Sequence, residues 1–408
     1  MSVKVGEKRY LIKLWSADYS TEESSFVDAR VSSYSSVLNS GLGQFSFQLE
    51  RTIQNWNDAG DIDLNKVIEL WVSDIDTGGE FIRVYAGYVS RINFIETYTS
   101  RTVTVVCLGF VSRLTKDVLK SSAQSTLHSH ATDGVSTTSP AASTDPSVMF
   151  KGIVDHARSS ANGNIPFINY RTLPTTSVEL TGITTQNVFR QKTYFEALNE
   201  VLALCPTDWF WKLDADSVLH LSGKPAEPTH TFGLGALERL EVSYSMEEIV
   251  NGALVWDRDT TYRYIEDANS VASYGRRVER KTITSAEDSN ALDKAAYAIV
   301  GENKDPRSIV RFVVSDNNEL ENLGNVLGAG YDIESIKVGQ TCNMSGIRSS
   351  AGEVLSGNML IRRVEIEPTR AFVEVDAKQK DVVDIISQIK KEKDDENSIT
   401  IPDSYTAV

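Results

Sequence analysis

Short segments in which apolar and polar residues alternate dominate the first 120 residues. The clearest is 44–49, where Phe45, Phe47 and Leu49 are separated by polar neighbours. Because successive side chains of a strand point to opposite faces, these three are expected on one face of a sheet. Three further segments share the pattern: 67–72, 83–92 and 101–108. Bounded by Gly, Asp and Asn, they predict an antiparallel sheet that forms a small barrel or a sandwich.

The length and charge of the chain limit the classes of protein it can be. Its 408 residues allow two to four domains, and 41% hydrophobic with 24% charged residues is ordinary globular usage. With 41 Lys and Arg against 56 Asp and Glu, the net charge of −15 disfavours specific nucleic-acid binding. No apolar run reaches the roughly 20 residues of a membrane span, and residues 1–10 lack a signal-like apolar stretch, so we expect neither a membrane span nor classical export.

The middle of the chain has a different character. Residues 121–148 are rich in Ser, Thr, Ala and Pro and predict an exposed loop or insertion. In 149–235, apolar residues at helical spacing predict helices near 147–160 and 194–204, followed by a hairpin at 209–221. We therefore expect a mixed α+β middle domain over 149–235.

The last third is again rich in strand patterns. Residues 236–378 predict strands around one inserted helix, 285–300, and 379–408 predict an amphipathic helix at 380–391 followed by a tail. The expected strands are 308–314, 336–343, 359–367 and 371–376. The fold class is thus mainly β with α+β insertions, in which two β-rich parts, 1–120 and 236–378, flank the mixed α/β middle.

Known catalytic motifs are missing from the sequence. It has no GxSxG, no HExxH, no P-loop and no GxGxxG after a strand. Cys107, Cys205 and Cys342 are far apart and lie in or beside apolar stretches, so each is expected to pack as a small hydrophobic residue in a chain made in a reducing cytoplasm.

Pairs of possible metal ligands are present, but none is accompanied by a third. His128 with His130 and Asp214 with Asp216 lack the further ligands that a zinc or calcium site needs. Other acidic pairs, at 247–248 and at 257 and 259, are expected to be solvated at turns or strand edges. We predict no catalytic residue, no cofactor and no metal site.

Two clusters could instead bind a partner. Trp209, Phe210 and Trp211 could stack on a sugar, but strand alternation places Phe210 opposite the two tryptophans, which favours packing on both faces. The basic run at 276–281 is explained by an exposed strand or by interface ion pairs.

Short strand, turn and helix-start patterns follow one another along the chain at 41–47, 67–72, 85–92, 105–109, 193–198, 209–214, 247–255, 273–277, 331–333 and 338–340. In this order they resemble the tail hub proteins of tailed bacteriophages. That family includes the hub of contractile-tail baseplates, the hub part of the tail-associated protein of long-tailed phages, and the related base of the type VI secretion spike. The residues around Tyr274 and Gly275 resemble a segment that precedes a helix in the family.

The resemblance implies a non-enzymatic component of a phage tail tip or baseplate. Each chain would supply two hub-type β-barrels, and three copies would form a pseudo-sixfold ring that joins a six-fold tail tube to a three-fold tip. Implied partners are two further copies of the chain, a tail tube or distal tail protein above, and a tip, spike or fibre protein below. The hub would be assembled in the host bacterial cytoplasm, reside in the virion, and let DNA pass through an acidic lumen during ejection.

The insertion at 121–148 departs from the family pattern, and its role is open. The chain ends at Val408 with no recognisable peptidase, lysozyme or fibre domain, which implies a free-standing hub. Two alternatives stay open: a carbohydrate-binding adhesin, which would be a monomer with glycan affinity, and a tail protein with cell-wall hydrolase activity.

Overall fold

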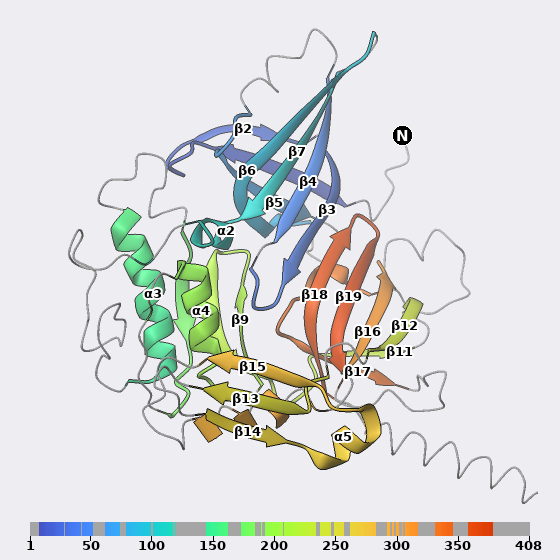
Figure 1. Ribbon diagram of the computed structural model, residues 1–408. Coiled ribbons are helices and arrows are strands. Elements are labelled where there is room, and N and C mark those ends of the chain that lie inside the picture. Colours follow the sequence, from blue (N-terminus) through green and yellow to red (C-terminus); the bar gives the residue numbers. More distant parts are fainter. Residues whose placement is uncertain are drawn as a thin grey trace, which may run out of the picture. The chain divides into compact units, whose positions relative to one another are not determined.

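The structure is a computed structural model, shown in Figure 1. It describes residues 8–27, 29–41, 43–51, 62–73, 79–98, 101–116, 119, 144–161, 173–183, 189, 192–206, 208–233, 237–245, 249–256, 262–282, 292–293, 296–297, 299–301, 304, 307–316, 331–345 and 358–377. The predicted helix at 380–391 and residues 121–143 of the predicted loop lie outside this set, as do His128 and His130. Residues 146–148, assigned to that loop from the sequence, instead begin helix α3.

The chain is mainly β, as predicted, and most of its strands belong to one large sheet. The first seven strands are β1 (Arg9–Trp15), β2 (Glu22–Phe26), β3 (Arg30–Val37), β4 (Gln44–Arg51), β5 (Val67–Ser73), β6 (Ile82–Glu96) and β7 (Arg101–Gly109). The later members are β11 (His230–Gly233), β12 (Leu237–Ser245), β16 (Arg307–Ser315), β17 (Thr341–Ser345), β18 (Met359–Glu367) and β19 (Arg370–Ala377). The order is β12-β16-β19-β18-β3-β4-β7-β6-β5-β1-β2, with β17 pairing with β18 and β11 with β17.

Alternation in the first strands is explained by burial of one face. Phe45, Phe47 and Leu49 of β4 are fully buried, and antiparallel pairing sets Phe47 beside Val105 of β7. The strands predicted at 44–49, 67–72, 83–92 and 101–108 are all confirmed. Each apolar side chain buried in this way contributes about 1.5–3 kcal/mol, which selects the register because a shift by one residue would expose the whole row.

Strand β3 connects the two ends of the sequence. It pairs with β4 on one side and with β18 on the other, where Val37 lies opposite Arg363. The strands of the last third therefore continue the sheet that the first 120 residues begin.

Helices cover a small second sheet between these β-rich parts. α3 (Pro146–Ala161) and α4 (Tyr194–Leu202) contribute to one buried core with the sheet β8-β10-β9. Its strands are β8 (Thr175–Val178), β9 (Trp209–Leu213) and β10 (Val218–Gly223), and the short α2 (Val111–Leu114) joins the same core. These elements confirm the helices predicted near 147–160 and 194–204 and the hairpin at 209–221.

The chain is divided into two compact units. The first contains residues 1–240, 311–342 and 360–375, and the second contains 241–310, 343–359 and 376–408. In the second unit a three-stranded sheet, of order β14-β13-β15, packs against apolar residues of the predicted helix 285–300. All residues of this segment that the structure describes are helical. Its elements are β13 (Gly252–Trp256), β14 (Tyr262–Glu266), α5 (Ala268–Tyr274) and β15 (Val278–Thr282). The two-barrel arrangement and the predicted domain borders stay predictions.

Three local predictions were wrong. The segment 336–343 is not one strand: η4 (Ile333–Ser335) precedes it, a turn follows at 338–339, and β17 starts at Thr341. Gly339 has a φ of +76°, a left-handed conformation that interrupts a strand. Segment 247–255, which resembles the strand that opens the second barrel in the hub family, is a strand only from Gly252 on among its described residues. The segment 273–277 contains the last residues of α5 instead of preceding a helix.

No helix among the residues that the structure describes is long and apolar enough to span a membrane.

Candidate functional site

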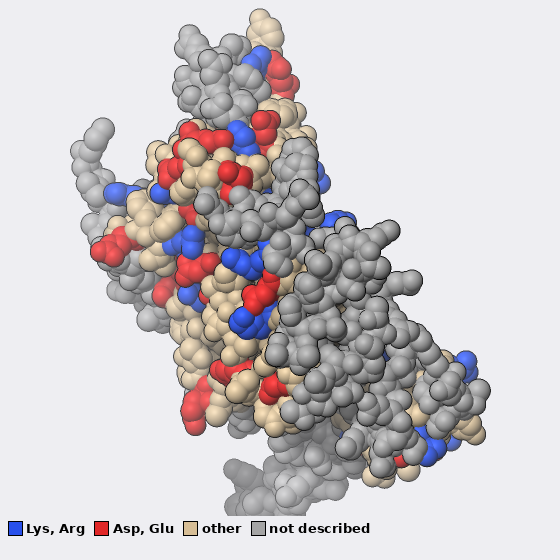
Figure 2. Space-filling model, turned by 90° about the vertical axis from the view of Figure 1, so that its left-hand side faces the viewer, with Lys and Arg blue, Asp and Glu red and all other residues tan. Residues whose placement is uncertain are grey.

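Charge is distributed without large single-sign areas on the surface in view in Figure 2. Acidic and basic side chains of the described residues are interspersed there. The net charge of −15 is therefore not concentrated on the described part of that face.

The cysteine and histidine side chains that the structure describes pack against or bind neighbouring groups of the protein. Cys107 and Cys342 are buried, and burial raises the pKa of the Cys342 thiol to about 12, so it stays protonated and unreactive at neutral pH. The buried His230 lies 2.5 Å from the Tyr331 hydroxyl and 2.8 Å from the side-chain oxygen of Gln340. Within the described ranges, no three His, Cys, Asp or Glu side chains are grouped as metal ligands.

The two acidic residues of the β9–β10 turn are engaged by protein groups. Asp214 accepts a hydrogen bond from the backbone N–H of Val218 at 2.8 Å and lies 2.7 Å from Nε2 of His220. Asp216 pairs with Arg83 across 2.5 Å. Asp214 thus closes the turn. Among the described residues, Asp214 and Asp216 belong to no group of three possible metal ligands. The other acidic pairs, at 247–248 and at 257 and 259, lie outside the described residues.

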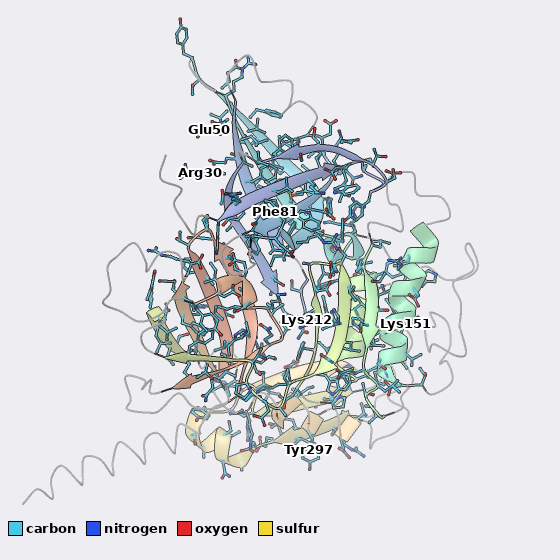
Figure 3. All side chains as sticks on the ribbon, turned by 180° about the vertical axis from the view of Figure 1, so that it is seen from behind. Arg30, Glu50, Phe81, Lys151, Lys212 and Tyr297 are labelled. Carbon is cyan, nitrogen blue, oxygen red and sulfur yellow. The ribbon has the colours of Figure 1, made fainter. Side chains whose placement is uncertain are left out.

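Strand β9 buries two of its three aromatic side chains, and Trp209 is partly buried against the same core as Trp211. Trp211 and Phe210 are 0% and 1% exposed on opposite faces, and Trp211 packs against Phe150 and Phe195 with ring centroids 6.4 and 5.9 Å apart. Neither buried ring can stack on a sugar. Lys212, labelled in Figure 3, is the next residue of the strand on the same face as Phe210.

A buried carboxylate joins the first strands to the β9–β10 turn. Glu69 of β5 is 2% exposed and accepts hydrogen bonds from the indole N–H groups of Trp15 at 3.1 Å and Trp71 at 3.0 Å. Its other oxygen accepts from the Tyr19 hydroxyl and from Arg83 at 2.6 Å. Arg83 in turn reaches Asp216, so the network extends from the core to the surface.

Hydrogen bonding keeps Glu69 ionised. Burial alone would raise the pKa of its carboxyl group, but the hydrogen bonds from Tyr19, Arg83 and Trp71 outweigh burial and lower the pKa below 4.5. Burial and the neighbouring Glu69 charge raise the pKa of Tyr19. The carboxylate is fully satisfied by donors, which indicates a structural role.

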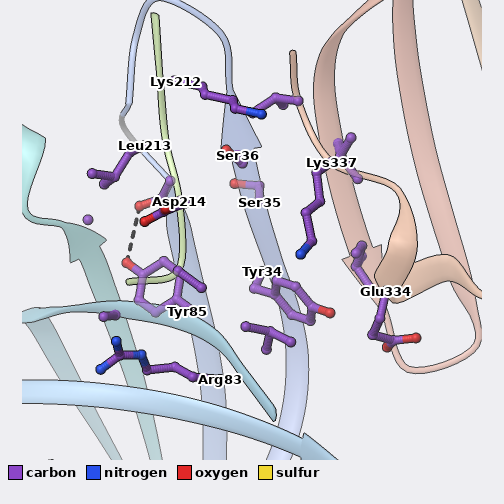
Figure 4. A pocket seen from close by; sticks show the side chains of 18 of the residues that line it. Tyr34, Ser35, Ser36, Arg83, Tyr85, Lys212, Leu213, Asp214, Glu334 and Lys337 are labelled. Atoms are coloured by element: carbon purple, nitrogen blue, oxygen red, sulfur yellow. Dashed lines mark hydrogen bonds between the residues drawn. The ribbon is translucent and has the colours of Figure 1, made fainter. Parts of the chain in front are cut away.

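A pocket opens beside this network, shown in Figure 4. It lies between β3, β6, the β9–β10 turn and the segment after η4, and its cavity volume is about 150 Å³. The apolar residues that line it include Val84, Leu213, Ile336, Val338, Val364 and Ile366. Charged residues line it as well: Arg83 of β6, Lys212 of β9, Asp214 of the β9–β10 turn, Glu334 of η4 and Lys337 of the segment after η4.

Three of the charged groups in the pocket already have partners. Arg83 is paired with Glu69 and Asp216, and Asp214 is bound by its own turn. Glu334, nearly buried, accepts from the buried ammonium of Lys8 at 2.7 and 2.8 Å.

The remaining two charges are lysines. Lys212 and Lys337 make no ion pair among the described residues. Figure 4 shows Lys212, from β9, near Ser36 of β3, and Lys337, from the segment after η4, extending toward Tyr34. Burial lowers the pKa of Lys212 most; Asp214 opposes this effect, and the positive charge of Lys337 adds to it.

Gly339 sets the position of one of these lysines. A Cβ atom at this glycine would lie 2.5 Å from Cε2 of Phe210 and 2.9 Å from Cδ of Lys212. Only a glycine lets the 338–339 turn pack this closely on β9. The sequence pattern at 338–340 contained this signal, but nothing in the sequence paired it with Lys212.

The tip of the β6–β7 hairpin exposes apolar side chains. Ile95 is 49% exposed and Tyr98 101%, and Figure 1 shows these strands extending beyond the rest of the sheet. Arg101 and Glu96 are opposite one another in the register and form an ion pair of 2.7 Å that closes the tip. Exposed apolar groups on a rigid hairpin are typical of a protein contact surface.

A second exposed aromatic area lies on the small sheet of the second unit. Tyr262 and Tyr264 of β14 are 64% and 43% exposed, and Val278 of β15 is 42% exposed. Tyr264 lies across Gly252, where a Cβ atom would be 3.1 Å from its hydroxyl oxygen. From the basic run at 276–281, Arg276 lies on this sheet's rim and pairs with Glu266 at 3.2 Å.

Among the described strands of the large sheet, β2, β12 and β11 are edge strands, since each pairs with one neighbour only. Edge strands leave backbone N–H and C=O groups unpaired, so they can add a strand from a neighbouring chain. Hairpin tip, aromatic sheet face and strand edges are the surfaces that the fold offers for assembly.

Three solved structures of tail proteins, two of them described as prophage proteins, share this fold. The 43 kDa tail protein of prophage MuSo2 from Shewanella oneidensis matches with a TM-score of 0.59 and 12% identity, over 90% of this chain and 98% of that one. The tail protein from Neisseria meningitidis MC58 has a TM-score of 0.57 and 10% identity, over 91% and 96%. Prophage tail protein gp18 from Listeria monocytogenes EGD-e has a TM-score of 0.53 and 9% identity, over 94% and 98%.

These similarities establish the fold. No protein-family model matches the sequence. No curated protein matches it either. The resemblance to phage tail hub proteins seen in the sequence is confirmed at the level of the fold.

Proposed function

We propose that the chain is a non-enzymatic structural hub of a phage tail tip or baseplate. The observation that carries the proposal is the extent of the fold similarity, which includes 96–98% of each of the three tail proteins. If only one domain were shared, much of those three chains would have no counterpart in this chain. The hub resides in the virion after assembly in the host bacterial cytoplasm, where the free cysteines stay reduced.

In this proposal three copies form a ring, and each contributes two hub-type β-barrels. The first barrel is built from residues 1–120 and the second from 236–378, with the middle domain 149–235 between them. The pairing of β3 with β18 supports the proposal, because it would tie the two barrels into one body. Six barrels in a ring of three chains would match a six-fold tail tube above and a three-fold tip below.

The partners are then two further copies, a tail tube or distal tail protein above, and a tip, spike or fibre protein below. The β6–β7 hairpin tip and the edge strands β2 and β12 are suited to these contacts, since they combine exposed apolar groups with unpaired backbone. DNA passes through the lumen without being bound, and the net charge of −15 favours such passage.

Mass measurement combined with electron microscopy tests the hub. The purified chain, alone and mixed with the neighbouring tail proteins of its phage, is expected to give a trimer and rings with a central hole. A monomer under both conditions would contradict the proposal. Hydrolysis of peptidoglycan by the purified chain, lost on substitution of one acidic residue, would contradict its non-enzymatic character.

A further inference from the structure

Two lysines of the pocket described above, Lys212 and Lys337, form no ion pair with any residue that the structure describes, although the charge of Asp214 acts on Lys212. Lys212 and Lys337 line it from separate elements, whereas Arg83, Asp214 and Glu334 are each engaged by other groups of the protein. Two like charges that face one cavity repel each other, and an anion between them removes that repulsion. A bound anion near both lysines would therefore be stabilised.

The walls of the cavity restrict what can carry that negative group. Val84, Ile336, Val364 and Ile366 offer apolar surface, so the rest of the ligand gains by being aliphatic. A cavity of roughly 150 Å³ accommodates a benzene-sized molecule, or about six non-hydrogen atoms, and the cavity volume here is about 150 Å³.

We propose that this pocket binds a carboxylate on a short aliphatic body, held between the ammonium groups of Lys212 and Lys337. Charge-assisted hydrogen bonds from both lysines hold the carboxylate oxygens. The apolar walls contact the aliphatic carbons. A free small acid and a glutamate side chain of a bound polypeptide share this chemistry. The proposal does not depend on ring assembly.

Butyrate, with six non-hydrogen atoms, is the probe, and butyramide is its uncharged control of equal size. Ligand-observed NMR titrations with the full-length protein are expected to show saturable butyrate binding, with butyramide at least tenfold weaker. Lys212→Met and Lys337→Met keep the length of the side chain and are each expected to weaken butyrate binding at least tenfold. Lys337 is exposed, so its variant keeps the fold.

Lys151→Met is the matched control variant. Lys151 is an exposed lysine on α3, labelled in Figure 3, and pairs with Asp155 on its own helix. It lines no part of the pocket, so its removal changes the net charge equally and is expected to alter butyrate affinity less than twofold.

A second titration separates the two sources of the carboxylate. The probes are capped Gly-Glu-Gly and its uncharged control, capped Gly-Gln-Gly. If only Gly-Glu-Gly binds at least as tightly as butyrate, the result supports a glutamate side chain of a polypeptide. If butyrate alone binds, the result supports a free acid. The proposal is wrong if neither carboxylate binds saturably, or if binding survives both Lys212→Met and Lys337→Met unchanged.

Discussion

Glu69 shows how one buried charge can organise a sheet. Five groups hold it or its neighbour Arg83, and they come from β1, the loop after it, β5, β6 and the β9–β10 turn. A buried carboxylate costs several kcal/mol unless donors satisfy it, so the network is stable only as a complete set. Removal of its centre therefore affects several elements together.

Glu69→Gln is expected to lower the free energy of unfolding by about 2–4 kcal/mol at pH 7. The glutamine NH₂ group would face donors of Trp15, Trp71 or Arg83 in place of an acceptor. Urea unfolding followed by tryptophan fluorescence measures the change, because Trp15 and Trp71 contact this site. Glu80→Gln is the control. Glu80 is exposed, so its substitution is expected to change the free energy of unfolding by less than about 0.5 kcal/mol.

The effect of Glu69→Gln is expected to depend on pH. Because the folded pKa of Glu69 is lower than its ordinary 4.5, ionisation stabilises the folded state. This contribution is complete above the unfolded pKa and is lost as pH falls through the lower folded value. The difference between wild type and variant should therefore shrink as the pH falls from 5 through the lowered folded pKa. A difference that is constant over this range would contradict the assignment.

Comparing Gly339 with Gly182 separates two costs of replacing a glycine: the steric clash of the new Cβ atom and the strain of the left-handed backbone. Gly339→Ala is expected to cost about 2–4 kcal/mol, because its methyl group would meet the buried ring of Phe210 in addition to the left-handed strain. Gly182 has nearly the same φ, +75° against +76°, but nothing lies within 4 Å of its would-be Cβ. Gly182→Ala should cost only the conformational part, about 1–2 kcal/mol. Equal losses in thermal or urea unfolding would rule out the steric explanation.

Among the elements, α4 has the best-defined start. The Thr193 hydroxyl accepts from the Glu196 backbone N–H at 3.1 Å, and the Glu196 carboxylate accepts from the Thr193 backbone N–H at 2.8 Å. Thr193→Ala is expected to destabilise the helix by about 1 kcal/mol, whereas Thr193→Ser keeps the hydroxyl and most of the stability. Amide hydrogen exchange in α4 measures this locally. Equal protection in both variants would show that the cap contributes nothing.

The elements differ in how far the sequence predicts them. α4 and the β9–β10 hairpin are local: their apolar spacing and capping or turn residues lie within a few positions. The 336–343 segment has an apolar pattern typical of a strand, but the positive φ of Gly339 and the Asp332 cap of η4 break it. The pairing of β3 with β18 is beyond such reasoning, since alternation decides which face of a strand is buried but not which distant strand lies beside it.

The same limit applies to the pocket. Glu69, a single carboxylate inside the apolar segment 67–72, is a signal that the sequence contains, because a buried acid needs partners. Its partner Arg83 and the lysines at 212 and 337 are ordinary surface residues in sequence terms. Only the fold brings Lys212 and Lys337 to one cavity.

At the scale of the whole molecule, the proposed ring needs contact surfaces that the single chain leaves exposed. The β6–β7 hairpin tip is the clearest of these, because Ile95 lies in its strand ladder, Tyr98 follows directly after it, and the Glu96–Arg101 pair joins its two strands. A pre-organised apolar group loses little conformational entropy on binding, so such side chains contribute strongly to association.

Ile95→Ser combined with Tyr98→Ser is expected to weaken assembly at least tenfold, at about 1.4 kcal/mol per tenfold change. Mass photometry of the chain with its tail partners measures assembly. Because both side chains are exposed, the thermal stability of the free chain should stay unchanged. Leu180→Ser with Tyr297→Ser, at sites 72% and 65% exposed, makes a matched apolar-to-polar change elsewhere. Equal assembly of both double variants would show that the hairpin tip is not a contact surface, whereas loss in the hairpin variant alone would place this tip at an interface of the ring.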